Sequence, residues 1–527
     1  MKFAFPAALI LAVTVTGCAS TAVPEVVDDT NNVTIADLDN AWYQAAQNDL
    51  HDARARMPGK TRARNVILFI GDGMSLATVT AARILEGQLR GESGEENLLS
   101  FERFPVTGLA KTYNTNSQVP DSAGTATAML SGVKTQISVL GVDENVRFRD
   151  CSSVADSSVP TLLEHAERHG LATGIVTTTR ITHATPASAY AHVASRSWEA
   201  DVGEQIQPCT DIATQLVEFD IGDGPEVILG GGRLAFFPET EADFEDNTAI
   251  GWRKDGRNLI REWLQRNNGA EFVWNLEQFE KAAISRTGPL LGLFEPYDMQ
   301  YEADRDRGPQ GEPSLAQMVE KAVRVLRQSD EGFFLLVEGG RIDHAHHQGN
   351  AYRALHDTLA LADAVEIARE LTSSDDTLIV VTADHGHVME IAGYPRRGNP
   401  ILGKVVSPLA EHEDQYSTDA LGLPYTTLVY GNGPGHIAAS DSQLAGVKSY
   451  PHQLEKYIES PATRPDLSDV DTGAAGYIQE AAVPMRSETH SGTDVPVYAD
   501  GPGAWLLTGV REQHYLFHVM LHALFGT

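Results

Sequence analysis

The sequence predicts an α/β fold built on a large, mainly parallel central sheet with helices on both faces. Three stretches, Asn65–Ile70, Phe333–Val337 and Thr377–Val381, are almost continuously apolar, as strands buried on both faces of a parallel sheet are. Segments with the spacing of amphipathic helices stand between such stretches. Strands and helices in alternation imply right-handed crossover connections, which place helices over both faces of the sheet.

The predicted elements follow one another regularly through most of the chain. The helix Ser314–Gln328 is the clearest, because its apolar residues recur along one stripe. The others are helices at Thr78–Leu89, Thr161–His169 (ended by Gly170) and Tyr352–Leu371, and strands at Leu171–Thr178 and Glu226–Leu229.

The alternation stops between Ile391 and Arg486. This region is rich in Gly, Pro and Ser, includes Asn432-Gly433-Pro434-Gly435, and is too long for a loop. We expect it to form an inserted subdomain. The sheet is expected to resume at Ala504–Thr508, and a helix at Gln513–Leu524 to close the chain.

The N-terminus is a targeting segment and takes no part in the fold. Lys2 precedes an apolar run, Phe3–Val15, that is too short for an ordinary membrane-spanning helix. The following Thr16-Gly17-Cys18 completes a stretch that resembles a bacterial lipoprotein box, in which Cys18 is lipidated and becomes the mature N-terminus. A plain signal peptide is the alternative. Both predict export, either to the periplasm or as an outer-membrane lipoprotein that touches the membrane only through its lipid.

A tether and a helix are expected to follow this leader. Residues 19–32 are small, polar and acidic, and Asp37–Met57 has helical spacing with Leu38, Trp42 and Ala45 on one face. The predicted division of the chain is a lipoprotein signal peptide at 1–17, a tether and helix at 18–59, a main domain at 60–390 and 487–527, and the inserted subdomain at 391–486.

Composition and charge exclude some partners. The 527-residue chain has 42% hydrophobic and 21% charged residues, which is ordinary for a soluble globular protein, but its formal net charge is -32. This charge argues against nucleic-acid binding, because phosphate backbones attract Lys and Arg surfaces. An anionic substrate is also not attracted unless bound cations reverse the local field. Salt adaptation of the source organism is another explanation of the acidic surface.

Cys151 and Cys209 are the only cysteines besides Cys18. In an oxidising compartment two such thiols favour a disulfide bond. A pair of buried, reduced cysteines is the alternative.

The stretch Val119–Ala128 places an acidic residue and a serine before a run of small residues that can form a tightly packed helix. Ser122 would then lie at a helix N-terminus, where free N–H groups and the helix dipole favour an anion. A serine in that position can serve as a nucleophile. The alternative is that Asp121 and Ser122 only cap the helix.

Carboxylate and imidazole side chains gather next to the predicted strands. The groups are Asp72 after the first strand, Glu338 with Arg341–His347, Asp384–His387, and Glu488–Gly492 before the last strand. Ligands of α/β proteins bind at the carboxyl ends of strands. Imidazole with carboxylate suits zinc, and oxygen ligands alone suit magnesium. Together the groups predict a site for several metal ions.

The ordered set of motifs resembles the alkaline phosphatase family from about Asn65 to the C-terminus. Each motif is weak alone, whereas the set is specific. The motifs, in family order, are Gly71-Asp72-Gly73, Asp121-Ser122-Ala123, His183-Ala184-Thr185-Pro186 through to Arg196, Glu338 through to His347, Asp384-His385-Gly386-His387, and His490. The resemblance implies hydrolysis of small phosphate monoesters to an alcohol and inorganic phosphate.

The resemblance also implies a role for each site residue. Ser122 would be the nucleophile that becomes phosphorylated, and Arg196 would hold the phosphate, because its planar guanidinium can meet two oxygens at once. Two Zn²⁺ and one Mg²⁺ would be the cofactors; two zinc ions roughly 4 Å apart can hold the attacking and leaving oxygens of an in-line displacement. The ligands would be Asp343, His347 and His490 for one zinc, Asp72, Asp384 and His385 for the second, and Asp72, Thr185 and Glu338 for magnesium.

Some residues around these ligands depart from the commonest family pattern. His183 and His344 stand where some members carry Asp and Lys; the double-histidine version also exists, so the departure bears on the affinity of the magnesium site. These two residues and Asp121 are expected beside the ligands. His346 and His387 match no ligand position and are expected to support the site structurally. The region 391–486 lies where the family carries a variable crown at the dimer interface, so a homodimer is expected.

Two other functions stay open. One is a phosphodiesterase or sulfatase of the same superfamily, and the other is an inactive, lipid-anchored phosphate-binding protein. Sulfatases use a modified Cys or Ser in a different local motif, and diesterases commonly use Thr as the nucleophile. Ser122 with Arg196 favours monoesters, and the complete ligand set argues against an inactive protein.

Overall fold

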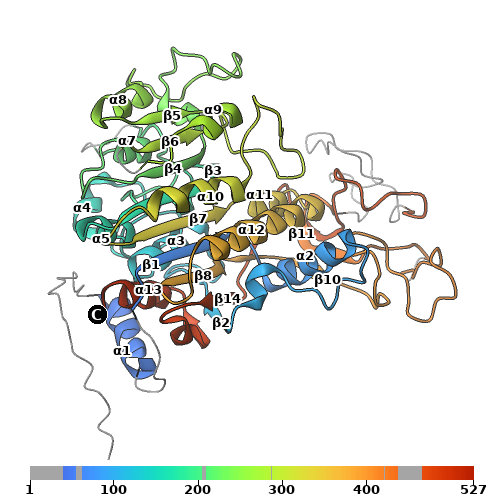
Figure 1. Ribbon diagram of the computed structural model, residues 1–527. Coiled ribbons are helices and arrows are strands. Elements are labelled where there is room, and N and C mark those ends of the chain that lie inside the picture. Colours follow the sequence, from blue (N-terminus) through green and yellow to red (C-terminus); the bar gives the residue numbers. More distant parts are fainter. Residues whose placement is uncertain are drawn as a thin grey trace, which may run out of the picture. The chain divides into compact units, whose positions relative to one another are not determined.

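Strand β1 (Asn65–Gly71) lies between β7 (Phe333–Gly339) and β8 (Thr377–Ala383), and both pairings are parallel. Every residue of these three strands is buried, which explains their almost continuous apolar sequences. The predicted strands and their buried position are therefore confirmed at the centre of the fold (Figure 1).

The computed structural model describes residues 40–54, 62–203, 209–285, 288–419, 422–436 and 466–526, all within one unit of the chain, Ile35–Thr527. The predicted signal peptide, Cys18 and the tether lie outside the described residues. None of the described helices is long and apolar enough to cross a membrane.

Among the described residues, ten strands form one sheet. Strand β14 is antiparallel to both of its neighbours, so the sheet is mixed but mainly parallel, as predicted. The order across the sheet is β15 (Gly509–Glu512), β2 (Val106–Lys111), β14 (Val495–Asp500), β8, β1, β7, β3 (Ala172–Arg180), β4 (Val227–Gly231), β6 (Leu290–Leu293) and β5 (Glu271–Val273).

Two groups of helices pack on this sheet. In the first, α10 (Leu315–Leu326) and α12 (Ala351–Leu371) contact each other and the central strands, and α12 also contacts α2 (Leu76–Leu89); Figure 1 shows α10 and α12 in front of the strands. In the second, α3 (Ser122–Ser131) contacts both α5 (Leu162–Arg168) and α13 (Tyr515–Phe525). Helices thus cover both faces, as the sequence predicts.

Local sequence explains where these helices begin and end. The Ser314 side chain caps α10 by accepting a hydrogen bond from the main-chain N–H of Gln317. The Gln317 side chain in turn accepts a hydrogen bond from the main-chain N–H of Ser314. Thr161 and Glu164 form the same arrangement before α5. Gly170, with a φ of +74°, follows α5, and a residue with a side chain would be strained in that conformation.

The shorter elements connect this framework. The helices are α1 (Ala41–Arg54), α4 (Val154–Ser157), α6 (Ala184–Ala187), α7 (Ile212–Val217), α8 (Leu259–Arg266), α9 (Leu276–Lys281) and α11 (Arg341–His347), with 3₁₀ turns at Ser100–Arg103, Cys151–Ser153, Arg233–Phe236 and Ala504–Leu507. The small strands are β9 (Gly386–His387), β10 (Met389–Ile391), β11 (Leu428–Gly433), β12 (Ala481–Pro484) and β13 (His490–Ser491).

The predicted strand Ala504–Thr508 is wrong, because most of it is a 3₁₀ turn. The strands lie on either side of it, as β14 and β15. A short apolar run is compatible with helix or strand, so periodicity cannot decide between them. Here β14 ends at Asp500, and Gly501 and Gly503, with φ values of 106° and 82°, turn the chain before the run.

Helix α1 forms within the predicted segment, but Ala45 of the predicted face is exposed. Tyr43, Ala46 and Leu50 are buried, whereas Ala45, expected on the buried face, is exposed. Tyr43 packs edge-on against His518 of α13, with ring centroids 4.6 Å apart. Trp42, from the predicted face, is half-buried and packs edge-on against His514, with ring centroids 5.7 Å apart, and Leu38 lies outside the described residues.

Strands β10, β11 and β12 form a separate three-stranded sheet. Strands β11 and β12 lie inside the predicted insertion, and β10 ends at its first residue, Ile391. The region therefore has secondary structure of its own, and the exact domain boundaries stay a prediction.

Cys151 and Cys209 form a disulfide bond, with Cα atoms 5.5 Å apart. The pairing is the one expected from the sequence. It joins the 3₁₀ turn at Cys151–Ser153 to the chain just before α7.

Replacing both cysteines with serine is expected to lower the free energy of unfolding by about 4 kcal/mol, because the bond closes a loop across a sequence separation of 58. Chemical denaturation of the oxidised protein and the double variant measures the difference. Alkylation of both thiols in the native protein without reductant would contradict the pairing.

Candidate active site

The register of the central strands brings three carboxylates to one edge of the sheet. Ile70 of β1 lies opposite Glu338 of β7, and Gly71 lies opposite Ala383 of β8. Asp72 and Asp384, the first residues after β1 and β8, therefore lie beside each other, two positions further along the sheet edge than Glu338. All three side chains are buried.

Ser122 is the first residue of α3, as the sequence predicts. Asp121 caps this helix, because its Oδ1 accepts hydrogen bonds from the main-chain N–H groups of Gly124 and Ser138 at 3.2 and 3.0 Å. Ser122 is buried, and its Oγ lies 3.2 Å from Nε2 of His385. Asp121 thus fixes the helix start, and Ser122 is left facing a metal-ligand cluster.

Asp72, Asp384 and His385 form the first candidate metal cluster. Nε2 of His385 lies 3.4 Å from Oδ1 of Asp72 and 3.3 Å from Oδ2 of Asp384. Three buried oxygens have no hydrogen-bond partner among the described residues: both carboxylate oxygens of Asp72, and Oδ2 of Asp384. Burial raises the pKa of Asp72 well above its usual value, and Asp384, Asp343 and Glu338 raise it further. Bound cations would satisfy these oxygens and remove the repulsion, so the residues fit a metal.

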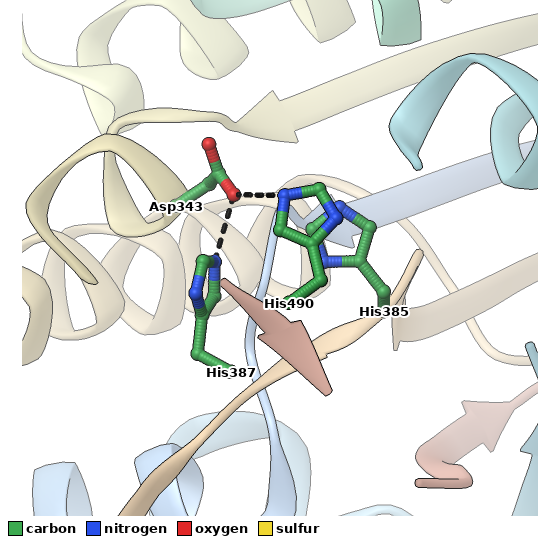
Figure 2. A group of neighbouring side chains, drawn as sticks. All are labelled: Asp343, His385, His387 and His490. Carbon is green, nitrogen blue, oxygen red and sulfur yellow. Dashed lines mark hydrogen bonds and ion pairs between the residues drawn. The ribbon is translucent and has the colours of Figure 1, made fainter. Parts of the chain in front are cut away.

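Asp343, His347 and His490 form the second cluster. Oδ1 of Asp343 lies 3.4 Å from Nε2 of His347 and 3.3 Å from Nε2 of His490. Figure 2 shows Asp343 between His490 and His387, with His385 beside His490. Burial acts to raise the pKa of Asp343, but the neighbouring histidines hold it well below its usual value.

Main-chain carbonyls orient the two imidazoles of this second cluster. Nδ1 of His347 donates to the carbonyl of Glu488 at 2.6 Å, and Nδ1 of His490 donates to the carbonyl of Pro120 at 2.8 Å. In the neutral imidazole of each, Nε2 is then the nitrogen without a proton, and it faces Asp343. A metal-binding histidine needs this arrangement.

His387 lies closer to the second cluster than the sequence suggested. Its Nε2 is 2.7 Å from Oδ1 of Asp343, and its Nδ1 hydrogen-bonds the Glu488 carboxylate. Burial alone would lower the pKa of His387, but Glu488 and Asp343 raise it to about 10. His387 could have been found from the sequence, because it is the second histidine of the motif Asp384-His385-Gly386-His387. The role of Glu488 could not, because its partner His387 is 101 positions away in the chain.

Asp72, Glu338 and His183 form the third cluster, in which one possible ligand atom from each lies within 4.8 Å of the others. Thr179 donates to Oε2 of Glu338 at 2.8 Å, and Thr185, buried in α6, lies close to the same carboxylate. Burial is the main cause that raises the pKa of Glu338 to about 7. The expected magnesium ligands are thus brought together, with His183 beside them.

Arg196 and the two distinguishing histidines lie next to this cluster. Arg196 donates to Oδ2 of Asp121 at 3.1 Å and to Nε2 of His183 at 2.8 Å. His344 accepts a hydrogen bond at Nδ1 from Arg341, at 2.8 Å. Burial lowers the pKa of His183 well below its usual value, and that of His344 to about 4. The histidine rings lie edge to face, with centroids 5.5 Å apart.

A buried serine at a helix N-terminus, facing carboxylate and imidazole clusters, is typical of metal-dependent phosphatases and related hydrolases. The sequence model of the alkaline phosphatase family matches residues 63–525. The tissue-nonspecific alkaline phosphatase of Gallus gallus is 46% identical over 493 residues, covering 92% of this chain and 88% of that protein. An alkaline phosphatase of Gadus morhua is 42% identical over 492 residues, covering 92% and 96%.

Solved structures agree with the sequence comparison. The alkaline phosphatase of Thermus thermophilus has a TM-score of 0.60 and 25% identity, with 93% of this chain and 96% of that chain covered. A cold-active alkaline phosphatase from a psychrophilic Shewanella species has a TM-score of 0.57 and 26% identity, with 87% and 99% covered. The chain belongs to the alkaline phosphatase family. It is a metal-binding phosphoric monoester hydrolase.

Proposed function

We propose that the chain hydrolyses phosphate monoesters through a phosphoserine on Ser122, with two Zn²⁺ and one Mg²⁺ as cofactors. The observation that carries this proposal is the position of the Ser122 hydroxyl, 3.2 Å from Nε2 of His385 in the cluster whose Asp72 oxygens are unpartnered among the described residues. The proposed ligands are Asp343, His347 and His490 for one zinc, Asp72, Asp384 and His385 for the other, and Asp72, Thr185 and Glu338 for magnesium.

The metal ions, when bound, supply positive charge to the attacking and leaving oxygens of the substrate. The protein's own groups prepare Ser122 for attack. The hydroxyl lies at the N-terminus of α3, where the helix dipole stabilises a developing alkoxide. Its burial excludes bulk water, which strengthens every charge interaction at the site.

Arg196 is proposed to bind the phosphate oxygens. Asp121 and His183 each accept one of its hydrogen bonds, so the guanidinium is oriented before substrate arrives. About a quarter of the Arg196 side chain is exposed, which leaves donors free to meet a ligand. Preorganisation of this kind lowers the entropy lost on binding.

Export and assembly are proposed from the sequence features described above. Lipidation of Cys18 would anchor an exported protein to the membrane, in the periplasm or at the outer membrane. The region 391–486, which contains the sheet of β10, β11 and β12, is proposed to act as the crown of a homodimer.

One comparison of substrates distinguishes the proposed reaction from its alternatives. We expect fast hydrolysis of an aryl phosphate monoester and much slower hydrolysis of the corresponding diester and sulfate. Exhaustive chelation should abolish the monoesterase activity, and zinc with magnesium should restore it. Faster cleavage of the diester or sulfate would favour the superfamily alternative, and full activity after chelation would exclude the metal mechanism.

Ser122→Ala is expected to abolish the phosphoenzyme and to lower kcat by at least about 10³-fold, because it removes the hydroxyl that lies 3.2 Å from Nε2 of His385 in the proposed zinc cluster. Acid-quenched reactions with labelled substrate measure the phosphoenzyme. Ser131→Ala is the matched control, since Ser131 is a buried serine of the same helix whose hydroxyl donates to the carbonyl of Thr127 at 2.7 Å. Labelled phosphoserine that persists in Ser122→Ala would contradict the assignment.

His183→Asp combined with His344→Lys is expected to tighten magnesium binding by about 10-fold and to lower KM, the phosphate inhibition constant and kcat at alkaline pH. A carboxylate attracts magnesium and orients its waters, and a lysine adds a cation that retains the phosphate product. The buried histidines, which are neutral at alkaline pH, do neither. Magnesium titration and phosphate inhibition measure the effects; two unchanged constants would show that these residues do not influence the third cluster.

A further inference from the structure

Glu488 makes two main-chain hydrogen bonds to His347 of the second cluster. Its N–H donates to the carbonyl of His347 at 2.9 Å, and its own carbonyl accepts from Nδ1 of His347 at 2.6 Å. The residue is 1% exposed. Two residues further along, His490 pairs with His387 in the small antiparallel ladder of β13 and β9. The segment around Glu488 is therefore tied directly to the Asp343 cluster.

The carboxylate of Glu488 makes a second set of contacts. Oε1 accepts from the main-chain N–H of Val388 at 2.8 Å, and Oε2 hydrogen-bonds Nδ1 of His387. Nε2 of His387 in turn lies 2.7 Å from Oδ1 of Asp343. An unbroken chain of hydrogen bonds thus runs from Glu488 through one imidazole to Asp343.

The His387 ring is also held from the side. It stacks on His346, with centroids 4.8 Å apart and an interplanar angle of 28°. His346 itself is fixed at both nitrogens, by Thr78 Oγ1 at 3.0 Å and the hydroxyl of Tyr430 at 2.8 Å. The ring therefore has no space to tilt away without breaking contacts in two elements.

Two glycines make room for this chain of contacts. A Cβ on Gly73, whose φ is +71°, would lie 2.4 Å from Cδ2 of His387. A Cβ on Gly433, whose φ is +137°, would lie 3.2 Å from Cβ of Glu488. Backbone thus packs directly against both His387 and Glu488, and neither side chain can be displaced toward these glycines.

We propose that Glu488 is a positioning residue for the zinc site of Asp343, His347 and His490. Its carboxylate holds His387 against Oδ1 of Asp343 and so fixes the orientation of the Asp343 carboxylate toward His347 and His490, while its carbonyl orients His347. The inference rests on the proposed function, because it requires a zinc ion at that cluster. Residues that orient metal ligands in this way typically change metal affinity by about 10–100-fold when they are replaced.

Zinc release from the loaded enzyme tests the proposal. Wild type, Glu488→Ala and Glu488→Gln are loaded with zinc and magnesium, and release into excess chromogenic chelator is followed in time. We expect Glu488→Ala to lose one of two zinc ions about 10–100-fold faster than wild type. Glu488→Gln should be intermediate, because its amide oxygen can still accept from Val388. The glutamine variant has nearly the same shape, so it tests the proposal even if the alanine variant does not fold.

Glu480→Ala and Glu480→Gln are the matched controls. Glu480 is a buried glutamate whose carboxylate hydrogen-bonds Tyr477 and Thr426 rather than His387 and Val388. Its variants should release zinc at the wild-type rate. The visible spectrum of the cobalt-substituted enzyme should change in Glu488→Ala and not in the controls, because it reports the geometry of the ligands.

The outcomes separate the inference from the function on which it rests. Release from Glu488→Ala and Glu488→Gln at the control rate overturns the inference. Loss of both zinc ions together, with a lower unfolding midpoint of the metal-free protein, also overturns it, because that is what a general structural role predicts. Asp343→Asn identifies the other failure: if this variant retains both zinc ions, the ligand assignment itself is wrong.

Discussion

Strand β1 pairs in parallel register with β7 on one side and β8 on the other, and this register determines where the acidic side chains of the site lie. Glu338 lies opposite Ile70, and Asp72 and Asp384 follow two residues beyond that level. A shift by one residue would turn every core side chain to the other face of the sheet. The packing of the apolar core, which fixes the strand register, thus also fixes the positions of the carboxylates.

This arrangement has an electrostatic cost. Buried carboxylates repel one another, and burial together with Asp384, Asp343 and Glu338 raises the pKa of Asp72 well above its usual value. The chain as a whole carries a formal net charge of -32, so its surface offers little compensation. Cations that bind the folded site remove the repulsion and stabilise the fold by mass action. The same cations give an acidic protein a pocket that attracts an anionic substrate.

Much of this site could be predicted from the sequence. Continuous apolar runs identified the buried strands, and polar residues directly after them, such as Asp72 and Asp384, pointed to the carboxyl edge of a parallel sheet. Ser122 was expected at a helix start, because Asp121 is a capping residue before a run of small residues. These inferences succeeded because each depends on local chemistry: strand burial, helix capping and chain order.

Other features depend on contacts that no local pattern contains. Tyr43 of α1 is buried against His518 of α13, and the run Ala504–Leu507 forms a 3₁₀ turn that packs against β2, β14 and α13. Neither outcome follows from periodicity. A helix face or a short apolar run takes its final form from the surface against which it packs, and that surface comes from elsewhere in the chain.

The sequence by itself determined the class of fold, the order of its elements and the types of ligand at the ends of the strands, because these follow from burial and from side-chain chemistry. Only the tertiary structure decided how the imidazoles face the site. The carbonyl that orients His490 belongs to Pro120, 370 positions away, and the one that orients His347 belongs to Glu488, 141 positions away. Carbonyl groups are common to all residues, so no sequence pattern marks the two that carry out this role; the fold selects them by bringing them within hydrogen-bond distance.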